Sequence, residues 1–249
     1  AGEVPHPLPA ASTGKKVAVI GGGPGGISAA YYLTLMGHQV TIFEQRKHLG
    51  GMLRYGIPNY RLPRKELDQE IRQIIDLGIQ VKTEVTVGEN PNIRDLREEY
   101  DAVYIAIGAH TDRKIGIEGE DAQGVISAVE MLRGIGDGEM PDYTGKEIVV
   151  IGGGNVAMDV ARSAIRLGAK RLSIAYRRRA VDMTAMPEEV EGAVQEGCEL
   201  LDLHAPLRIE KDSEGKVAAL WVKPQIIGPV KNGRPVPMDS SQEPVRLPC

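Results

Sequence analysis

The sequence predicts an α/β fold with two dinucleotide-binding domains of the Rossmann type. Two apolar runs, 15–20 and 146–151, each lead into a glycine-rich segment, 21–26 and 152–157. Both segments have the spacing G-x-G-x-x-G/A and precede a stretch with helical periodicity, which is the context that a dinucleotide fingerprint requires. One such segment is weak evidence. Two of them in 249 residues indicate a chain that brings two dinucleotides together.

The first fingerprint is predicted to bind a pyrophosphate. Gly21 allows a tight turn, Gly23 lets the phosphates approach the backbone, and Gly26 lets the helix pack closely on the strand. A helix is expected over 24–36, because Pro24 suits the first turn of a helix. The N-terminal N–H groups of this helix would point at the phosphates.

An acidic residue follows at the place where a ribose is bound. After Gly37, which ends the helix, residues 39–43 are predicted to form a strand that leads into Glu44. An acid about twenty residues beyond the last glycine hydrogen-bonds ribose hydroxyls. The alternative is that Glu44 is a solvated carboxylate at a strand end. The first site therefore suits a dinucleotide with a free ribose.

The second fingerprint has arginines where the first has an acid. A helix is expected over 155–167 and a strand over 171–176, which is followed by Arg177, Arg178 and Arg179. A carboxylate there would repel a 2′-phosphate, whereas guanidinium groups can pair with it. The alternative is a solvated basic face. We expect NADP(H) at the second site, with NAD(H) possible.

The remaining pattern predicts an extended arm over 1–14, a first domain over 15–140 and a second over 141–249. Further helices are expected over 64–77 and 90–99 and from residues 127 and 187. Strands are expected over 79–81, 102–107 (buried) and 199–202, with a hairpin joining 207–209 to 217–222. From Lys223 the chain is proline-rich and polar, and no strand that closes the second parallel sheet is expected before Cys249.

Composition excludes several function classes. The formal net charge of -4 does not favour nucleic acid. There is no apolar run of membrane-spanning length and no secretion signal, so we expect a soluble cytoplasmic protein. Cys198 and Cys249 form no C-x-x-C pair, so the chain cannot ligate an iron–sulfur cluster alone. We expect no metal site and read Cys198, His204 and the carboxylates of 188–189 as structural.

Three further segments carry a resemblance: the turn 50–53, the run Gly-Ile-Pro-Asn-Tyr-Arg-Leu-Pro over 56–63, and residues 176–189. Together with the first fingerprint, they resemble the glutamate synthase small-subunit family. That family includes the similar flavoprotein halves of dihydropyrimidine dehydrogenase and of NADH-dependent ferredoxin:NADP oxidoreductase. The resemblance covers almost the whole chain from Lys15.

The resemblance implies an FAD domain interrupted by an inserted NAD(P)H domain, in a subunit of a hetero-oligomeric complex. Electrons would pass from the nicotinamide through the flavin to an iron–sulfur domain or subunit, and no side chain need be catalytic because the cofactors carry the reaction. By position, the FAD contacts would be Gly21, Gly23, Pro24, Gly25, Gly26, Glu44, Gly51, Leu53, Arg61, Val87 and Gly108. The contacts of the second nucleotide would be Gly154, Asn155, Val156, Ala157, Arg177 and Arg178.

The chain departs from that family in two places. Many relatives carry a basic residue just before the Met-Pro pair, where Thr184 and Ala185 stand here, which weakens the case for NADP over NAD. Relatives also continue past the position of Cys249 with a second flavin-contacting segment. We therefore expect weak FAD retention and slow NADPH oxidation for this chain alone.

Two alternatives stay open. One is a flavoprotein of the disulfide-reductase kind, which the absence of a C-x-x-C pair disfavours. The other is a nucleotide-bound structural or assembly module that turns nothing over.

Overall fold

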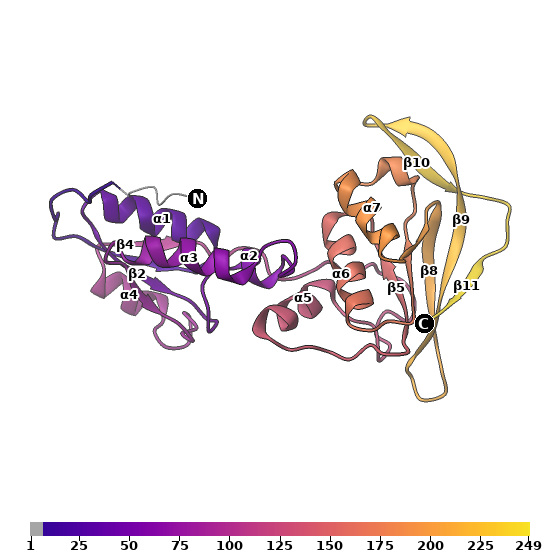
Figure 1. Ribbon diagram of the computed structural model, residues 1–249, viewed down its shortest axis with the longest axis horizontal. Helices are drawn as coiled ribbons and strands as arrows, with labels where there is room; N and C mark the ends of the chain where they lie inside the picture. The colour runs from indigo at the N-terminus through magenta and orange to yellow at the C-terminus, as the bar shows by residue number, and fades with distance from the viewer. Residues whose placement is uncertain (1–6) are drawn as a thin grey trace. The chain divides into compact units, whose positions relative to one another are not determined.

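The computed structural model describes residues 7–249, which divide into two compact units on either side of the step from His110 to Thr111 (Figure 1). The division comes earlier than the boundary at residue 140 that the sequence predicts. Helix α5 (Ala128–Asp137) accounts for the difference, because its Leu132 is buried in the core of the second unit. Of the expected arm, residues 1–6 lie outside the described part. Residues 7–14 form no helix or strand, and the N–H of Ala10 donates to the carbonyl of Leu35 at 2.9 Å.

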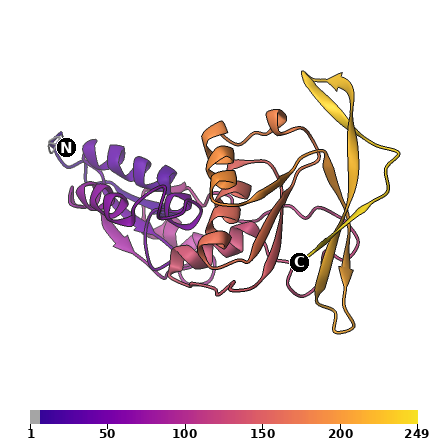
Figure 2. The ribbon, with the colours of Figure 1, turned by 45° about the vertical axis from the view of Figure 1, so that its right-hand side comes forward.

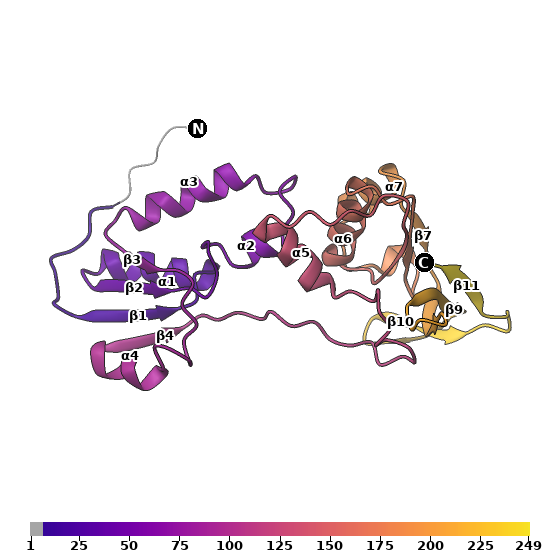
Figure 3. The same cartoon turned by 90° about the horizontal axis from the view of Figure 1, so that it is seen from below.

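The first unit is a parallel sheet between two layers of helices (Figure 3). Its strands β1 (Lys16–Ile20), β2 (Gln39–Phe43), β3 (Gln80–Lys82) and β4 (Ala102–Ile105) lie in the order β3-β2-β1-β4. Helices α1 (Pro24–Leu35) and α3 (Arg64–Ile75) pack on one face, and α4 (Ile93–Glu99) packs on the other. The right-handed crossover of a parallel sheet brings the carboxyl ends of β1 and β2 to one edge, where the first glycine turn lies.

The strand expected to be buried over 102–107 is shorter and more exposed than predicted. In the described part of the chain, β4 is an edge strand that pairs with β1 alone. Tyr104, Ile105 and Ile107 are 47%, 58% and 60% exposed. A continuous apolar run indicates burial on both faces, but it does not say whether a neighbouring strand is present.

The second unit has three layers (Figures 1 and 2). The central parallel sheet has the order β5-β6-β7, built from β5 (Glu147–Ile151), β6 (Arg171–Ala175) and β7 (Glu199–Leu201). One face packs on α5, α6 (Asn155–Arg166) and α7 (Pro187–Gln195). The other face packs on an antiparallel sheet of β8 (His204–Lys211), β9 (Val217–Lys231) and β11 (Val245–Pro248). The expected hairpin is therefore present, as β8 and β9.

The segment after Lys223 contains more strand than the sequence predicts. Strand β9 continues to Lys231, and β10 (Arg234–Asp239) pairs back onto it (Figure 2). The connecting residues Asn232 and Gly233 both have positive φ, 51° and 74°, as a two-residue Asn-Gly hairpin requires. Prolines mask this signal, yet they are tolerated in strands that lie at an edge. Strand β11 joins β9 and not the parallel sheet, which has three strands in residues 7–249.

Candidate dinucleotide-binding sites

Two glycines of the first turn are required by the packing of the protein itself. Gly21 has a φ of +105°, and a Cβ placed on it would lie 2.4 Å from the carbonyl oxygen of Ala106. A Cβ on Gly26 would lie 1.8 Å from the carbonyl oxygen of Gly21. Real Cβ atoms do not approach oxygen so closely, so both positions need glycine for the β1–α1 turn to close.

Gly23 and Gly25 differ, because the fold leaves room for a side chain at both. A Cβ on Gly23 would meet its nearest atom, the Cα of Gly51, at 3.5 Å, and one on Gly25 would meet nothing closer than 3.9 Å. The backbone of Gly23, with φ -80° and ψ -176°, is open to any residue. These glycines keep free the space above the N-terminus of α1, where the first N–H groups lack helical partners. This cradle fits a pyrophosphate, which a Cβ would crowd.

Glu44 is part of the same turn. The residue is only 6% exposed, so Glu44 is not a solvated carboxylate at a strand end. Oε2 accepts a hydrogen bond from the N–H of Gly22 at 2.7 Å, and Oε1 accepts one from the N–H of Arg46 at 2.8 Å. Because each carboxylate oxygen has a second lone pair, both can still accept a ribose hydroxyl. The ribose contact stays a prediction.

The Gly50–Gly51 turn lies directly against the first fingerprint. The N–H of Gly50 donates to the carbonyl of Gly22 at 2.8 Å, and Gly51 has a φ of +49°. A Cβ on Gly51 would lie 2.6 Å from the Cα of Gly23. The structure thus brings Gly51 to the predicted site, and the short helix α2 (Met52–Tyr55), which carries half-buried Leu53, begins there.

Three other predicted FAD residues lie in different parts of the first unit. Arg61 is exposed on the loop after α2, and half-buried Val87 packs against the core cluster that contains Phe43. Gly108, with a φ of +69°, follows Ala106, whose carbonyl approaches Gly21. Their cofactor contacts stay predictions.

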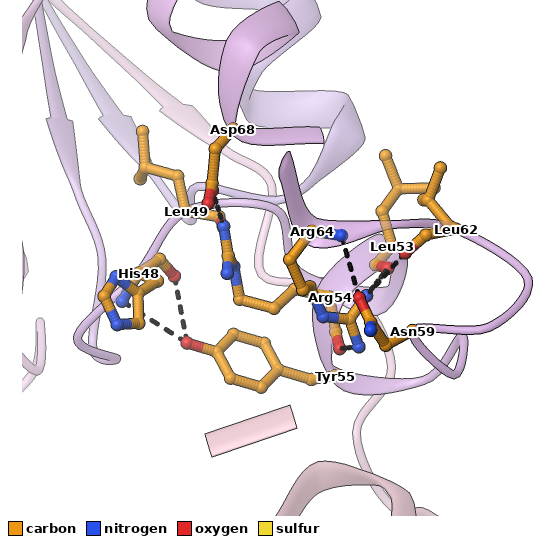
Figure 4. A network of polar contacts seen from close by, with 9 residues as sticks. All are labelled: His48, Leu49, Leu53, Arg54, Tyr55, Asn59, Leu62, Arg64 and Asp68. Atoms are coloured by element: carbon orange, nitrogen blue, oxygen red, sulfur yellow. Dashed lines mark hydrogen bonds and ion pairs between the residues drawn. The ribbon is translucent and has the colours of Figure 1, made fainter. Parts of the chain in front are cut away.

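Arg64, which sequence reasoning missed, holds the loop after α2 in shape (Figure 4). Its guanidinium donates to the carbonyl oxygens of Leu53 at 3.1 Å, of Ile57 at 2.8 Å and of Arg54. Burial, followed by the charge of Arg54, lowers the pKa of Arg64 from its usual value. A cation in the first turn of a helix is unfavourable with respect to the helix dipole. This unfavourable position is the one feature of the sequence that could have indicated a structural role for Arg64.

The same network joins the loop to its neighbours (Figure 4). Buried Arg54 donates through Nε to the carbonyl of Leu49 at 2.8 Å and forms an ion pair with Asp68 on α3. The hydroxyl of Tyr55 donates to the carbonyl of His48 at 3.1 Å. Side-chain bonds therefore fix the segment that carries Gly51, Leu53 and Arg61, where regular backbone pairing is sparse.

We expect Arg64→Lys to lower the free energy of unfolding of the first unit by about 1–3 kcal/mol. A lysine ammonium cannot reach three carbonyls at once, so partly buried acceptors lose their partners. Urea denaturation of the full chain measures the change. Arg72→Lys, at an exposed position of α3, is the matched control and should shift the value by less than about 0.5 kcal/mol. Equal shifts in the two variants would contradict the role of Arg64.

In the second glycine turn, as in the first, the fold requires some glycines and leaves space at another. Gly152 has a φ of +145°, and a Cβ on Gly153 would lie 2.5 Å from the ring of Tyr176. Gly154, in contrast, would meet nothing closer than the Oγ1 of Thr184 at 3.5 Å. The fold therefore needs the first two glycines and leaves space at the third, beside the N-terminus of α6. Asn155, half-buried there, accepts the N–H of Met186 through Oδ1 at 2.8 Å.

Two residues of the first turn of α6 differ in exposure. Val156 is 50% exposed, whereas Ala157 is buried at the point where the fingerprint requires a small residue. Met186, whose backbone N–H donates to Oδ1 of Asn155, is exposed as well. The nucleotide contacts of these residues stay predictions.

The three arginines after β6 have different surroundings. Arg179 pairs with Asp182 through two hydrogen bonds of 2.8 and 2.9 Å, so it holds the loop together. Arg177 is exposed and forms no ion pair within residues 7–249. The Nε of Arg178 is buried and has no acceptor in this part of the chain. An unsatisfied buried donor costs about 1–3 kcal/mol, so it favours an anionic ligand group at Arg178.

The side chains read as structural do have structural partners. Cys198 is buried in the core of the second unit, and burial raises the pKa of its thiol to about 11. Nδ1 of His204 lies 2.6 Å from the carbonyl of Asp202. Glu189 pairs with Arg162 at 2.6 Å. In residues 7–249 no group of three or more metal-binding side chains is present, and no helix is long and apolar enough to cross a membrane.

Comparison with known proteins decides the family. Residues 15–208 match the pyridine nucleotide-disulphide oxidoreductase family. The chain belongs to this family. The expected α/β architecture with two dinucleotide-binding folds is confirmed by this match and by the parallel sheets.

Two curated relatives of this family member are informative. The chain is 36% identical over 233 residues to the glutamate synthase [NADPH] small chain of Escherichia coli (strain K12), with 89% of this chain and 49% of that protein covered. It is 41% identical over 244 residues to the NADP(+)-dependent formate dehydrogenase subunit beta of Moorella thermoacetica, with 96% and 34% covered. The resemblance to the glutamate synthase small subunit is confirmed. The chain spans only about a third to a half of the length of these relatives.

A solved structure shares the fold. Mycobacterium tuberculosis FprA in complex with NADPH matches with a TM-score of 0.79 and 21% sequence identity, covering 94% of this chain and 68% of that one. At this identity, the match shows that the two chains share a fold.

Proposed function

We propose that this chain is the FAD- and NADP(H)-binding part of an oxidoreductase that passes electrons from NADPH through FAD to an external acceptor. The proposal rests mainly on the two glycine turns, because at Gly23 and Gly154 the packing of the protein itself does not require glycine. Both lie at the start of a helix of twelve residues, and a Cβ on either would meet nothing closer than 3.5 Å. The names of the E. coli and M. thermoacetica relatives, which include NADPH and NADP(+), support the same conclusion.

FAD is the proposed ligand of the first turn. The N-terminus of α1 would bind the pyrophosphate, and Glu44 would orient the ribose. Two backbone hydrogen bonds, from Gly22 and Arg46, already hold the Glu44 carboxylate in place. When bound, FAD supplies hydride acceptance and onward electron transfer. The residues of this chain would bind the ligand and orient it.

NADP(H) is the proposed ligand of the second turn. Arg177 and Arg178 would bind the 2′-phosphate, and Arg178 supports this role through its buried, unsatisfied Nε. Arg179 does not take part, because Asp182 already occupies its guanidinium. No side chain is assigned a catalytic role.

The partners belong to the proposal as well. Relatives described as a small chain or a subunit beta support a place in a hetero-oligomeric complex. The iron–sulfur nature of the acceptor and the cytoplasmic location rest on the sequence analysis and stay predictions. The disulfide-reductase alternative is disfavoured, since Cys198 is buried and its raised pKa keeps it a thiol.

An anaerobic titration tests the proposed function. The purified chain is saturated with excess FAD, NADPH is added, and the flavin absorbance is followed before and after an artificial electron acceptor is supplied. We expect NADPH to bleach the bound flavin and the acceptor to restore it. Binding of both ligands without bleaching would favour the structural or assembly module. Failure to bind FAD would contradict the proposal.

A further inference from the structure

Thr184 lies next to Gly154, the glycine of the second turn at which the fold leaves space for a side chain. Its Oγ1 is the nearest atom, at 3.5 Å, to a Cβ placed on Gly154. Gly154 occupies the position at which the fingerprint brings the phosphates of a dinucleotide close to the backbone. The hydroxyl of Thr184 is therefore at the edge of the space that the phosphates would fill.

The backbone around Thr184 is firmly held. The N–H groups of Thr184 and Ala185 both donate to the carbonyl of Gly153 at 3.0 Å. The N–H of Met186 donates to Oδ1 of Asn155 at 2.8 Å, and Ala185 is buried. Three hydrogen bonds thus fasten this loop to the glycine turn, so the position of Thr184 does not depend on a ligand.

The side chain of Thr184, in contrast, is available. It is exposed, and its hydrogen bond to the carbonyl of Gly153 is 3.5 Å long, well beyond the usual distance for a hydroxyl donor. A phosphate oxygen is a stronger acceptor than this carbonyl, because the bond would be charge-assisted.

We propose that the Thr184 hydroxyl donates a hydrogen bond to the pyrophosphate of the dinucleotide at the second turn, and so raises the affinity for NADP(H) and NAD(H) alike. This inference rests on the proposed function. The pyrophosphate is common to both coenzymes, whereas Arg177 and Arg178 would contact a group that only NADP(H) has. The preference for NADP(H) therefore does not require a basic residue at position 184.

Binding of NADP+ and NAD+ to the full chain tests the inference, measured by calorimetry. Thr184→Val removes the hydroxyl and keeps the shape of the side chain, so both dissociation constants should rise by a similar factor of about three to ten. Thr184→Ser keeps the hydroxyl and should bind both coenzymes within about twofold of the unaltered chain. Thr144→Val, an exposed threonine of the same unit, is the matched control and should change neither constant. Circular dichroism confirms that each variant is folded.

Unchanged binding by Thr184→Val would overturn the inference and leave the proposed function standing. Weaker binding of NADP+ alone would also overturn it, because the hydroxyl would then contact the 2′-phosphate. If the unaltered chain bound neither coenzyme, the proposed function itself would fail.

Discussion

Gly26→Ala is expected to lower the free energy of unfolding of the first unit by about 3 kcal/mol, because its Cβ would lie 1.8 Å from the carbonyl oxygen of Gly21. The atom in the way belongs to the backbone, so no rotamer change relieves the overlap. Helix α1 must move away from β1, and the buried Ile27 and Ala30 would lose part of their packing. Chemical denaturation of the full chain measures the loss.

Gly25→Ala is the matched control for this variant. The neighbouring position offers its Cβ 3.9 Å of clearance, so the free energy of unfolding should stay the same or rise by up to about 1 kcal/mol as a helical glycine is replaced. If Gly26→Ala were as stable as Gly25→Ala, the close approach of α1 to β1 would not be needed.

Arg177→Asp should weaken NADP+ binding by about 2–4 kcal/mol while NAD+ binding changes little. The substitution removes one partner of the 2′-phosphate and adds a negative charge that repels it. Exposed Arg177 has no ion pair in the described part of the chain, so the fold should lose little. Calorimetric titration with both coenzymes measures the two dissociation constants.

Arg171→Asp makes the same charge change at the other end of β6. Arg171 pairs with Glu199 at 2.8 Å on the surface, so this control should affect both coenzymes weakly and equally. Equal losses of NADP+ and NAD+ binding in Arg177→Asp would show that the arginine does not recognise the 2′-phosphate.

The elements around both glycine turns could be predicted because local rules and the fold agree there. An apolar strand, glycines at fixed spacing and an amphipathic or small-residue helix leave one geometry. The fingerprint already assigns Gly26 to close packing of helix on strand and Gly23 to the approach of phosphates. The structure adds the distances, because a Cβ on Gly26 would lie 1.8 Å from the carbonyl oxygen of Gly21, whereas one on Gly23 would meet its nearest atom at 3.5 Å.

What the sequence missed depends on contacts between distant residues. Arg64 acts through backbone carbonyls, and carbonyls are present at every residue, so no side-chain pattern marks its partners. Strand β10 was missed because it contains prolines, which cannot donate a ladder hydrogen bond. Prolines are tolerated where a strand lies at an edge, and the sequence does not show which strands do. The exposure of β4 depends on which strands lie beside it. Likewise, α5 belongs to the second unit through the burial of Leu132.

The central claim is that the first glycine turn keeps its open space for the pyrophosphate of FAD. Titration of the full chain with FAD, before and after Gly23→Ala, tests this claim most directly. The new Cβ would meet only ordinary contacts, the nearest at 3.5 Å, so the free energy of unfolding should fall by at most about 1 kcal/mol. The dissociation constant for FAD should nevertheless rise at least about tenfold, because the methyl group takes the place of the phosphates. An alanine variant that binds FAD as tightly as the unaltered chain would contradict the claim.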